Sequence, residues 1–437
     1  MSNSGLLSPL RRRPFRHLAI SYAVNEMGDW LGIVALSVLV FEATNSALAT
    51  TLLFLGTGFL PALLTPLFVA RLERPPPRYV LPLIYAAEAA AFTGLALLAD
   101  NFSLAAIVAI AAVDGALALT AKSLTRGVTA AMLAPHDELR SGNAVLNVAF
   151  TWGAAAGPAL GGAVVAGLGV RSALLLDAVS FYVIAWIVFL AGAMPEAEAE
   201  EEDTPLRERM SAGLTYIRSN VTLKRLIVAE ALALTFFSLV VPIEVVYAKD
   251  SLGVGDVGYG VLLSSWGAGM VAGSVVFAVL RRASLPFLFF FSTFAIGASY
   301  LGMAAAPTLV VACVASVVGG TGNGVHWVVA VSAVQELTPQ SMQVRTIGTL
   351  ESIASAAPGI SYVLGGVIAS AWDPRATFVV AGAGVLVVVA AAVPLLGYKW
   401  LDRPANGDSK SLDGGNDVVL ELLPGGRPVQ SDSEVLT

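Results

Sequence analysis

Two acidic side chains lie close together inside the first long apolar run of this sequence. Glu26 and Asp29 stand three residues apart, which places them on one face of a helix. A charge at bilayer depth costs at least about 2.5–3.5 kcal/mol, so such residues persist mainly where they face a polar cavity or a partner. Two carboxylates on one dehydrated face favour protonation of at least one of them. The pair therefore predicts a proton-coupling site.

Further acids occupy similar positions in other apolar runs, and we treat all of them as candidates for proton coupling. Besides Glu26 and Asp29, the candidates are Glu88, Asp114, Asp177 and Glu351. The alternative for each is a structural role, in which the carboxylate caps or hydrogen-bonds a neighbouring helix. Glu230 and Glu244 fall toward the ends of their runs, so we expect them near the membrane surface.

The composition is that of a membrane protein. Of 437 residues, 56% are hydrophobic and 13% are charged, with a mean hydropathy of +0.77. A soluble protein carries roughly 25% charged residues. The net charge is −6, and the sequence has no stripe of basic residues, so we do not expect nucleic acid as a partner. The single cysteine, Cys313, and three scattered histidines predict neither a disulfide nor a metal site, and we expect no cofactor.

Long apolar stretches predict an all-α integral membrane protein with twelve transmembrane helices. A membrane span needs about 20 apolar residues. The expected spans are 18–41, 46–70, 79–99, 103–126, 143–167, 172–193, 224–247, 257–280, 286–305, 308–333, 346–370 and 376–397. Lys and Arg concentrate in the tails, the central linker and alternate loops, which predicts that both termini are cytosolic. Arg11 to Arg16, before the first span, belong to an uncleaved cytosolic start.

The chain divides into two similar halves. We expect a cytosolic tail at 1–16, a six-helix bundle at 17–193, an acidic linker with an amphipathic helix at 194–222, a second bundle at 223–398 and a disordered cytosolic tail at 399–437. A shift of about 204 residues aligns Pro135 with Pro339, Gly161-Gly162 with Gly365-Gly366, and Arg171 with Arg375. Two pseudo-symmetric bundles, with a substrate site between them, follow from this repeat.

One stretch of the fifth span combines small residues with a proline. Its conspicuous members are Gly153, Gly157, Pro158, Gly161 and Gly162. Small residues four apart let two helices approach closely, and proline bends the helix beside that smooth face. The stretch predicts either a static packing seam or a surface at which helices rock against each other.

Taken together, these features resemble the major facilitator superfamily over nearly the whole chain. The glycine-proline stretch looks like the antiporter motif G-x8-G-x3-G-P-x2-G-G of that superfamily, with Ala144 at its first glycine. This likeness implies efflux against protons. Phe15-Arg16, Gly28-Asp29-Trp30 and the loop from Leu133 to Ala144 are similar to the macrolide-efflux and enterobactin-exporter branch.

The resemblance also assigns roles to basic residues. Arg126 resembles the basic residue of the family's fourth span and could pair with a protonatable carboxylate, although Asp114 lies three turns away. As an alternative, Arg126 anchors the helix at the inner surface, and we expect that role for Lys122. In the loop after span two, Arg71, Glu73 and Arg74 are candidates for the family's cytosolic latch, but Ala70 replaces its aspartate.

The remaining candidates are polar or aromatic residues that could line a substrate cavity, or equally pack or anchor helices. They are Asn25, Trp30, Asn147, Trp152, Asn323, His326 and Trp327.

Our expectation is a monomeric, multi-pass transporter of the cytoplasmic membrane. It would export small amphipathic or hydrophobic compounds by alternating access, with the proton gradient as driving force. Importer or uniporter activity on the same fold is one alternative, and a non-transporting sensor or scaffold is another. No nucleophile–base pair or phosphate loop predicts an enzyme.

Overall fold

The computed structural model describes residues 7–72, 76–190, 214–280, 283–339 and 342–396. In this part of the chain, twelve helical segments are long and apolar enough to cross a membrane, and each overlaps one of the predicted spans. The predicted all-α membrane fold is therefore confirmed. The acidic linker, most of the amphipathic helix and the tail after residue 396 lie outside the described residues.

The first six spans run from Arg13 to Leu190. They are α1 (Arg13–Thr44), α2 (Ala47–Phe54) continued by the π-helical turn η2 (Leu55–Phe59) into α3 (Leu60–Leu72), α4 (Pro77–Leu98), α5 (Leu104–Leu133), α6 (Leu139–Leu168) and α7 (Val170–Leu190). A short helix η1 (Ser8–Arg11) precedes them, and η3 (Ala134–His136) follows α5.

The second six spans run from Val221 to Pro394. The first of them is interrupted: α9 (Val221–Ser238) gives way to η4 (Val241–Ile243), α10 (Glu244–Val246) and the π-helical turn η5 (Tyr247–Ser251). The others are α11 (Asp256–Val279), α12 (Leu285–Ala305), α13 (Leu309–Glu336), α14 (Gln343–Ala371) and α15 (Pro374–Leu396). A helical segment at 214–219 precedes α9, and its Ile217 is buried.

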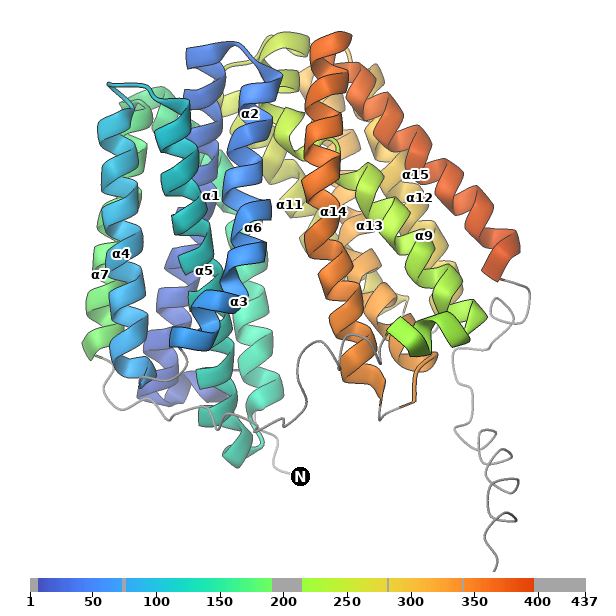
Figure 1. Cartoon of the computed structure of the whole chain (residues 1–437), viewed down its shortest axis with the longest axis horizontal. Coiled ribbons are helices and arrows are strands. Elements are labelled where there is room, and N and C mark those ends of the chain that lie inside the picture. The colour runs from blue at the N-terminus through green and yellow to red at the C-terminus, as the bar shows by residue number, and fades with distance from the viewer. Residues whose placement is uncertain (1–6, 73–75, 191–213, 281–282, 340–341, 397–437) are drawn as a thin grey trace, which may run out of the picture.

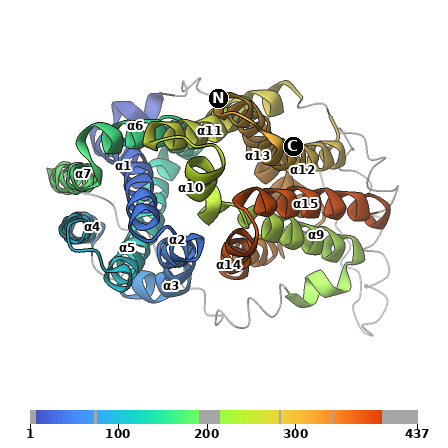
Figure 2. The same ribbon diagram turned by 90° about the horizontal axis from the view of Figure 1, so that it is seen from above.

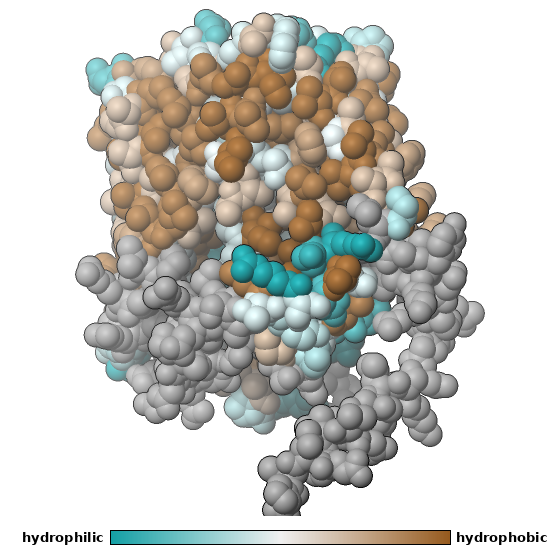
Figure 3. Space-filling model, turned by 45° about the vertical axis from the view of Figure 1, so that its right-hand side comes forward, coloured by the Kyte–Doolittle hydropathy of each residue, from teal (hydrophilic) through white to brown (hydrophobic). Residues whose placement is uncertain are grey.

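Helix ends coincide with residues suited to them. Asn220 and Ser46 cap α9 and α2, because their side chains accept hydrogen bonds from the backbone N–H groups of Leu223 and Ala49. Asn45 ends α1 in the left-handed region at φ 46°, where asparagine is tolerated better than most residues. The surface of the molecule is broadly apolar, with hydrophilic residues at its two ends (Figure 3).

The helices form two groups that face each other. Helices α1 to α7 gather on one side of the molecule and α9 to α15 on the other (Figure 1). Seen from above, α6 lies beside α11 and α2 faces α14 (Figure 2). We name the side on which α1 begins the terminal side and the opposite one the far side.

Corresponding arginines support the repeat. Arg171, at the start of α7, binds Asp100 in the loop after α4. Arg375, at the start of α15, donates to the carbonyl oxygens of Ala304, in the last turn of α12, and of Ala306, directly after it, both at 2.7 Å. The shift of 204 residues that aligns the two arginines also aligns Asp100 with Ala304. The last helix of each half is thus tied to the equivalent loop of its own half.

Contacts between the halves extend from the middle of the helices to the far side. There, Lys249 on η5 binds Glu42 of α1 at 2.5 Å and Asp256 of α11 at 2.6 Å. Deeper, the hydroxyl of Thr51 on α2 lies 3.4 Å from the carbonyl oxygen of Tyr362 on α14. These contacts hold the two halves together on the far side.

Candidate functional site

The first predicted carboxylate pair shares one lysine. The ammonium of Lys122 on α5 lies 3.0 Å from Glu26 Oε1 and 3.0 Å from Asp29 Oδ2. The buried amide of Asn25 donates to the same Asp29 oxygen at 3.3 Å. One cation can bridge both acids because they lie on one face of α1, as their spacing predicts. Glu26 is almost fully buried, whereas Asp29 keeps 26% of its side chain exposed.

This geometry corrects the expected role of Lys122. We expected an anchor at the inner surface, but its ammonium binds two acids inside the first half. Arg126 lies one turn further along α5 with an exposed side chain, so the partner role expected of Arg126 belongs to Lys122. The available signal was the cost of any charge within an apolar run, which applies to lysine as much as to acids.

Three more carboxylates surround this pair from α4, α5 and α7. Glu88 is fully buried, and neither of its oxygens has a hydrogen-bond partner among the described residues. Asp177 accepts a hydrogen bond from Ser180 Oγ at 3.2 Å, while its second oxygen has none. Asp114 Oδ1 is likewise unpartnered, and all three acids lie within electrostatic range of Asp29. An unpartnered buried carboxylate is costly when ionised.

Glycines of α1 make room for one of these acids. A Cβ atom at Gly32 would lie 2.8 Å from Asp177 Oδ2, and one at Gly28 would overlap the other oxygen. The two glycines stand four residues apart, so α7 can approach α1 with its carboxylate between the helices. The Gly28-Asp29-Trp30 pattern thus combines a carboxylate of α1 with space for a carboxylate of α7. We name Glu26, Asp29, Glu88, Asp114, Asp177 and Lys122 the acidic cluster.

The predicted glycine-proline stretch packs directly behind this cluster. Cβ atoms at Gly153 and Gly157 would lie 2.9 Å from Glu26 Cβ and 2.6 Å from Trp30 Cβ, respectively. Gly161 lies on the same face, and a Cβ atom there would lie 3.2 Å from Leu31 Cα. Every fourth residue of α6 is therefore small because the backbone of α1 lies against it.

The other face of the same stretch contacts the second half. A Cβ at Gly162 would overlap the carbonyl oxygen of Asp256 on α11, and one at Gly260 would overlap that of Pro158. The backbone N–H of Ala159 donates to Ser264 Oγ at 2.8 Å. The stretch thus joins the acidic cluster to the crossing of α6 and α11 between the halves.

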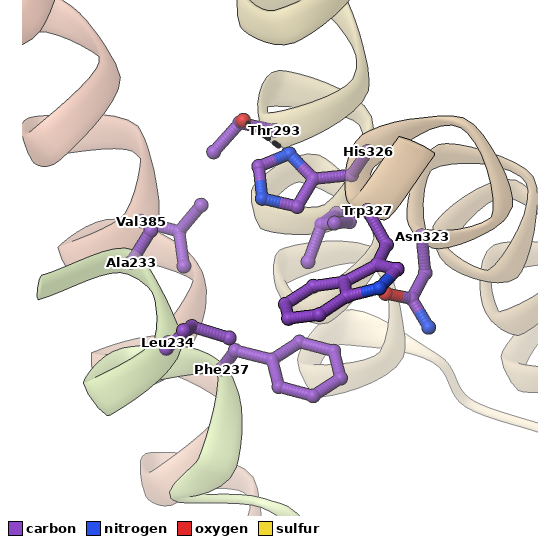
Figure 4. Close-up of a pocket in the computed structure, with 9 residues that line it drawn as sticks. Ala233, Leu234, Phe237, Thr293, Asn323, His326, Trp327 and Val385 are labelled. Atoms are coloured by element: carbon purple, nitrogen blue, oxygen red, sulfur yellow. Dashed lines mark hydrogen bonds between the residues drawn. The ribbon is translucent and has the colours of Figure 1, made fainter. Parts of the chain in front are cut away.

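A second buried acid–base pair lies in the other half. His326 Nε2 on α13 lies 3.0 Å from each carboxylate oxygen of Glu230 on α9. Glu230 is 1% exposed, so our expectation of a surface position for it is wrong. Inside the bundle, His326 provides a hydrogen-bond partner for both of its carboxylate oxygens. Asn323, His326 and Trp327 border a cavity of about 30 Å³ together with Phe237 and Thr293 (Figure 4), while their expected place in a substrate cavity stays a prediction.

The other candidate residues are placed as follows. Trp152 and Asn147 on α6 are exposed, and Trp30 is half-buried. Glu244 is half-buried at the interruption after α9. The side chains of Glu351 and Arg71, and residues Glu73 and Arg74 of the expected latch, lie outside the described residues. Whether these residues bind substrate or latch the halves stays a prediction.

Comparison with known proteins identifies the family. The family model described as transmembrane secretion effector, of the major facilitator superfamily, matches residues 4–405. The chain belongs to this family. The chain is therefore a multi-pass membrane transporter of the major facilitator type, as its resemblance implied.

Relatives and solved structures agree with this assignment. The chain is 22% identical over 396 residues to the uncharacterized MFS-type transporter YfiS of Bacillus subtilis (strain 168), covering 87% of this chain and 92% of that one. Its fold is similar to the nucleoside transporter NupG, with a TM-score of 0.71 at 11% identity over 88% of this chain and 99% of that chain. A bacterial homologue of the iron transporter ferroportin in an inward-facing state gives 0.68 at 17% identity, covering 90% and 99%. At these identities the solved structures show the fold alone.

Proposed function

We propose that this transporter exports small amphipathic or hydrophobic compounds across the cytoplasmic membrane in exchange for protons. The observation that carries the proposal is the acidic cluster, in which five carboxylates gather and one lysine binds two of them. Ionising all of them at once would bury several uncompensated charges. Proton binding relieves this repulsion, and so does a cationic group of a substrate.

Competition between protons and substrate for the same carboxylates would couple their movements. Asp29 is the member of the pair that keeps exposure, so it is the candidate for contact with substrate or water. Glu26, held by the same lysine, transmits a change at Asp29 because Lys122 can strengthen its bond to one acid when the other is protonated. Alternating access then requires that protonation and substrate binding favour different conformations.

The crossing of α6 and α11 defines which side of the transporter is closed in this structure. With both termini in the cytosol, as the distribution of Lys and Arg predicts, the far side is the outer side. The contacts of Gly162 with Asp256 and of Lys249 with Glu42 then close the outer side of the transporter. This arrangement supports a state that receives substrate from the cytosol. The likeness of α6 to the antiporter motif supports export in the same direction.

The test is transport by purified protein in proteoliposomes, with a panel of lipophilic cations, macrolides and siderophores, with and without a pH gradient. We expect Asp29→Asn to abolish proton-driven transport and to weaken the binding of cationic substrates, because the amide keeps the shape of the side chain but can neither release a proton nor form an ion pair. Asp100→Asn, in a loop on the far side, is the matched control and should transport like the unaltered protein.

Undiminished transport by Asp29→Asn under a pH gradient would overturn proton coupling at this site. Transport that ignores the gradient in the unaltered protein would instead favour a uniporter.

A further inference from the structure

The hydrogen-bond pattern around His326 determines where its ring carries protons. The hydroxyls of Thr293 and Ser292 on α12 both donate to the carbonyl oxygen of Phe289, at 2.7 and 3.0 Å. Each hydroxyl has only one hydrogen, so its oxygen can only accept from the ring. Thr293 Oγ1 lies 3.0 Å from Nδ1 and Ser292 Oγ 3.4 Å from it. Nδ1, the ring nitrogen that faces these hydroxyls, therefore carries a proton.

The opposite nitrogen faces Glu230. Nε2 lies 3.0 Å from both carboxylate oxygens, which fits one N–H shared by the two oxygens of an ionised carboxylate. Without that proton, the Nε2 lone pair would point at a buried negative charge. The arrangement thus needs one proton between Nε2 and the carboxylate in addition to the one on Nδ1, and the equal distances to both oxygens favour Nε2 as its position.

The repeat places this pair opposite its counterpart in the first half. The shift of 204 residues that aligns Arg171 with Arg375 also aligns Glu26 with Glu230 and Lys122 with His326. The same acid–base contact between the first and fourth spans is therefore present once per half. Lysine keeps its proton under ordinary conditions, whereas imidazole gains and loses one near neutral pH.

The imidazole of His326 borders a small cavity. His326, Thr293 and Asn323 border the cavity of about 30 Å³, which holds about one water. Figure 4 shows the imidazole and the indole of Trp327 on the same side of this space.

Other ionisable side chains on the packed helices stand elsewhere. Among the described side chains they are Lys224 and Arg225 on α9, Asp256 and Tyr259 on α11, Tyr300 on α12, Cys313 and Glu336 on α13, Tyr362 on α14, and Arg375 on α15. Of the described side chains, the ionisable one bonded to the ring is Glu230.

We propose that Glu230 and His326 form a second proton-binding site, in which one exchangeable proton resides on Nε2. The site is separate from the acidic cluster and goes beyond the proposed exporter function.

The histidine count makes the test direct. The chain has three histidines, so His17→Gln with His136→Gln leaves His326 alone. The full chain, labelled with ¹⁵N-histidine and placed in lipid nanodiscs, is titrated from pH 5 to pH 10 by nuclear magnetic resonance. We expect two protonated ring nitrogens at low pH, and loss of the Nε2 proton alone as the pH rises.

Glu230→Gln is the matched variant, because it keeps the shape and removes the charge. In this variant we expect Nε2 to lose its proton at a proton concentration at least tenfold higher, that is, at lower pH. Nδ1 should stay protonated. A ring that is neutral throughout the titration in the Glu230 protein overturns the proposal, and so does an unchanged titration in Glu230→Gln. Both results are read without substrate or gradient, so they are independent of the exporter proposal.

Discussion

The two halves of this transporter share a scaffold but differ in how they hold buried charge. The first half surrounds its acid–base pair with Asp29, Glu88, Asp114 and Asp177. At the corresponding positions, the second half has Ala233, Ser292, Val318 and Ala381. One acid–base pair is thus common to both halves, whereas the additional acids belong to the first.

This difference indicates that the buried charges of the two halves have different roles. The common pair, Glu26–Lys122 or Glu230–His326, connects the first and fourth spans of each half and belongs to the repeated scaffold. We propose that the additional carboxylates of the first half bind the protons or cationic groups that are exchanged during transport. In the second half, the exchange of lysine for histidine makes the scaffold pair itself titratable.

Removing the cation from each pair should give the largest difference between the halves. Lys122→Met leaves Glu26 and Asp29 without their cation, and breaking a buried ion pair costs about 3–5 kcal/mol. Because Lys122 keeps 29% of its side chain exposed, we expect a loss toward the lower end of this range. His326→Met should cost less, since among the described side chains no second carboxylate lies at hydrogen-bond distance from Glu230, which can become neutral by taking up one proton.

The measurement is the thermal stability of each variant by fluorescence-detected size-exclusion chromatography. Lys122→Met combined with Glu26→Gln and Asp29→Asn serves as the control and should recover most of the stability. Equal losses in Lys122→Met and His326→Met would contradict the distinction between the two pairs.

The equivalent glycines Gly162 and Gly366 should respond unequally to alanine. At Gly162 the added methyl group meets the backbone of Asp256 on α11, which cannot move aside without separating the halves. At Gly366 it meets the side chain of Thr51, which can adopt another rotamer. We expect Gly162→Ala to lower the transport rate about tenfold and Gly366→Ala less than threefold.

Gly167→Ala on the same helix as Gly162 is the control for helix propensity, because a Cβ there meets nothing within 4 Å. All three variants are compared by initial transport rate at equal amounts of folded protein. Similar rates for Gly162→Ala and Gly366→Ala would show that the contact of α6 with α11 and the contact of α14 with α2 are equivalent.

Periodicity and composition predict most of this fold, because a membrane span is a long apolar run that needs little tertiary information. All twelve spans and the shared face of Glu26 and Asp29 follow from such local patterns. The partners of buried charges do not, because they depend on which helices pack together. Lys122 and Glu230 were misplaced for this reason, and the interruption after α9 has no strong signal beyond Pro242. Extending the repeat register to Glu26 and Lys122 would have indicated Glu230 and His326 beforehand.

The smallest predicted difference concerns the terminal side of each half. Arg12 donates to Glu138 at 2.6 Å, and this hydrogen bond lowers the pKa of the Glu138 carboxyl below its ordinary value of 4.5. A lowered pKa contributes stability above the ordinary value, and that stability is lost as the pH falls through the lowered value. The repeat aligns Arg12 with Tyr216, whose hydroxyl instead donates to the carbonyl oxygen of Leu337 at 3.4 Å.

We therefore expect Arg12→Gln to lower the melting temperature slightly at pH 7, by about 2 °C or less, and by a smaller amount at pH 3, below the ordinary pKa of the Glu138 carboxyl. Tyr216→Phe, which removes an uncharged contact, should cause a loss that is the same at both pH values. The measurement is the melting temperature of the purified protein at pH 7 and pH 3. A loss in Arg12→Gln that persists unchanged at pH 3 would mean that the guanidinium stabilises the terminal side through packing rather than through the charge of Glu138.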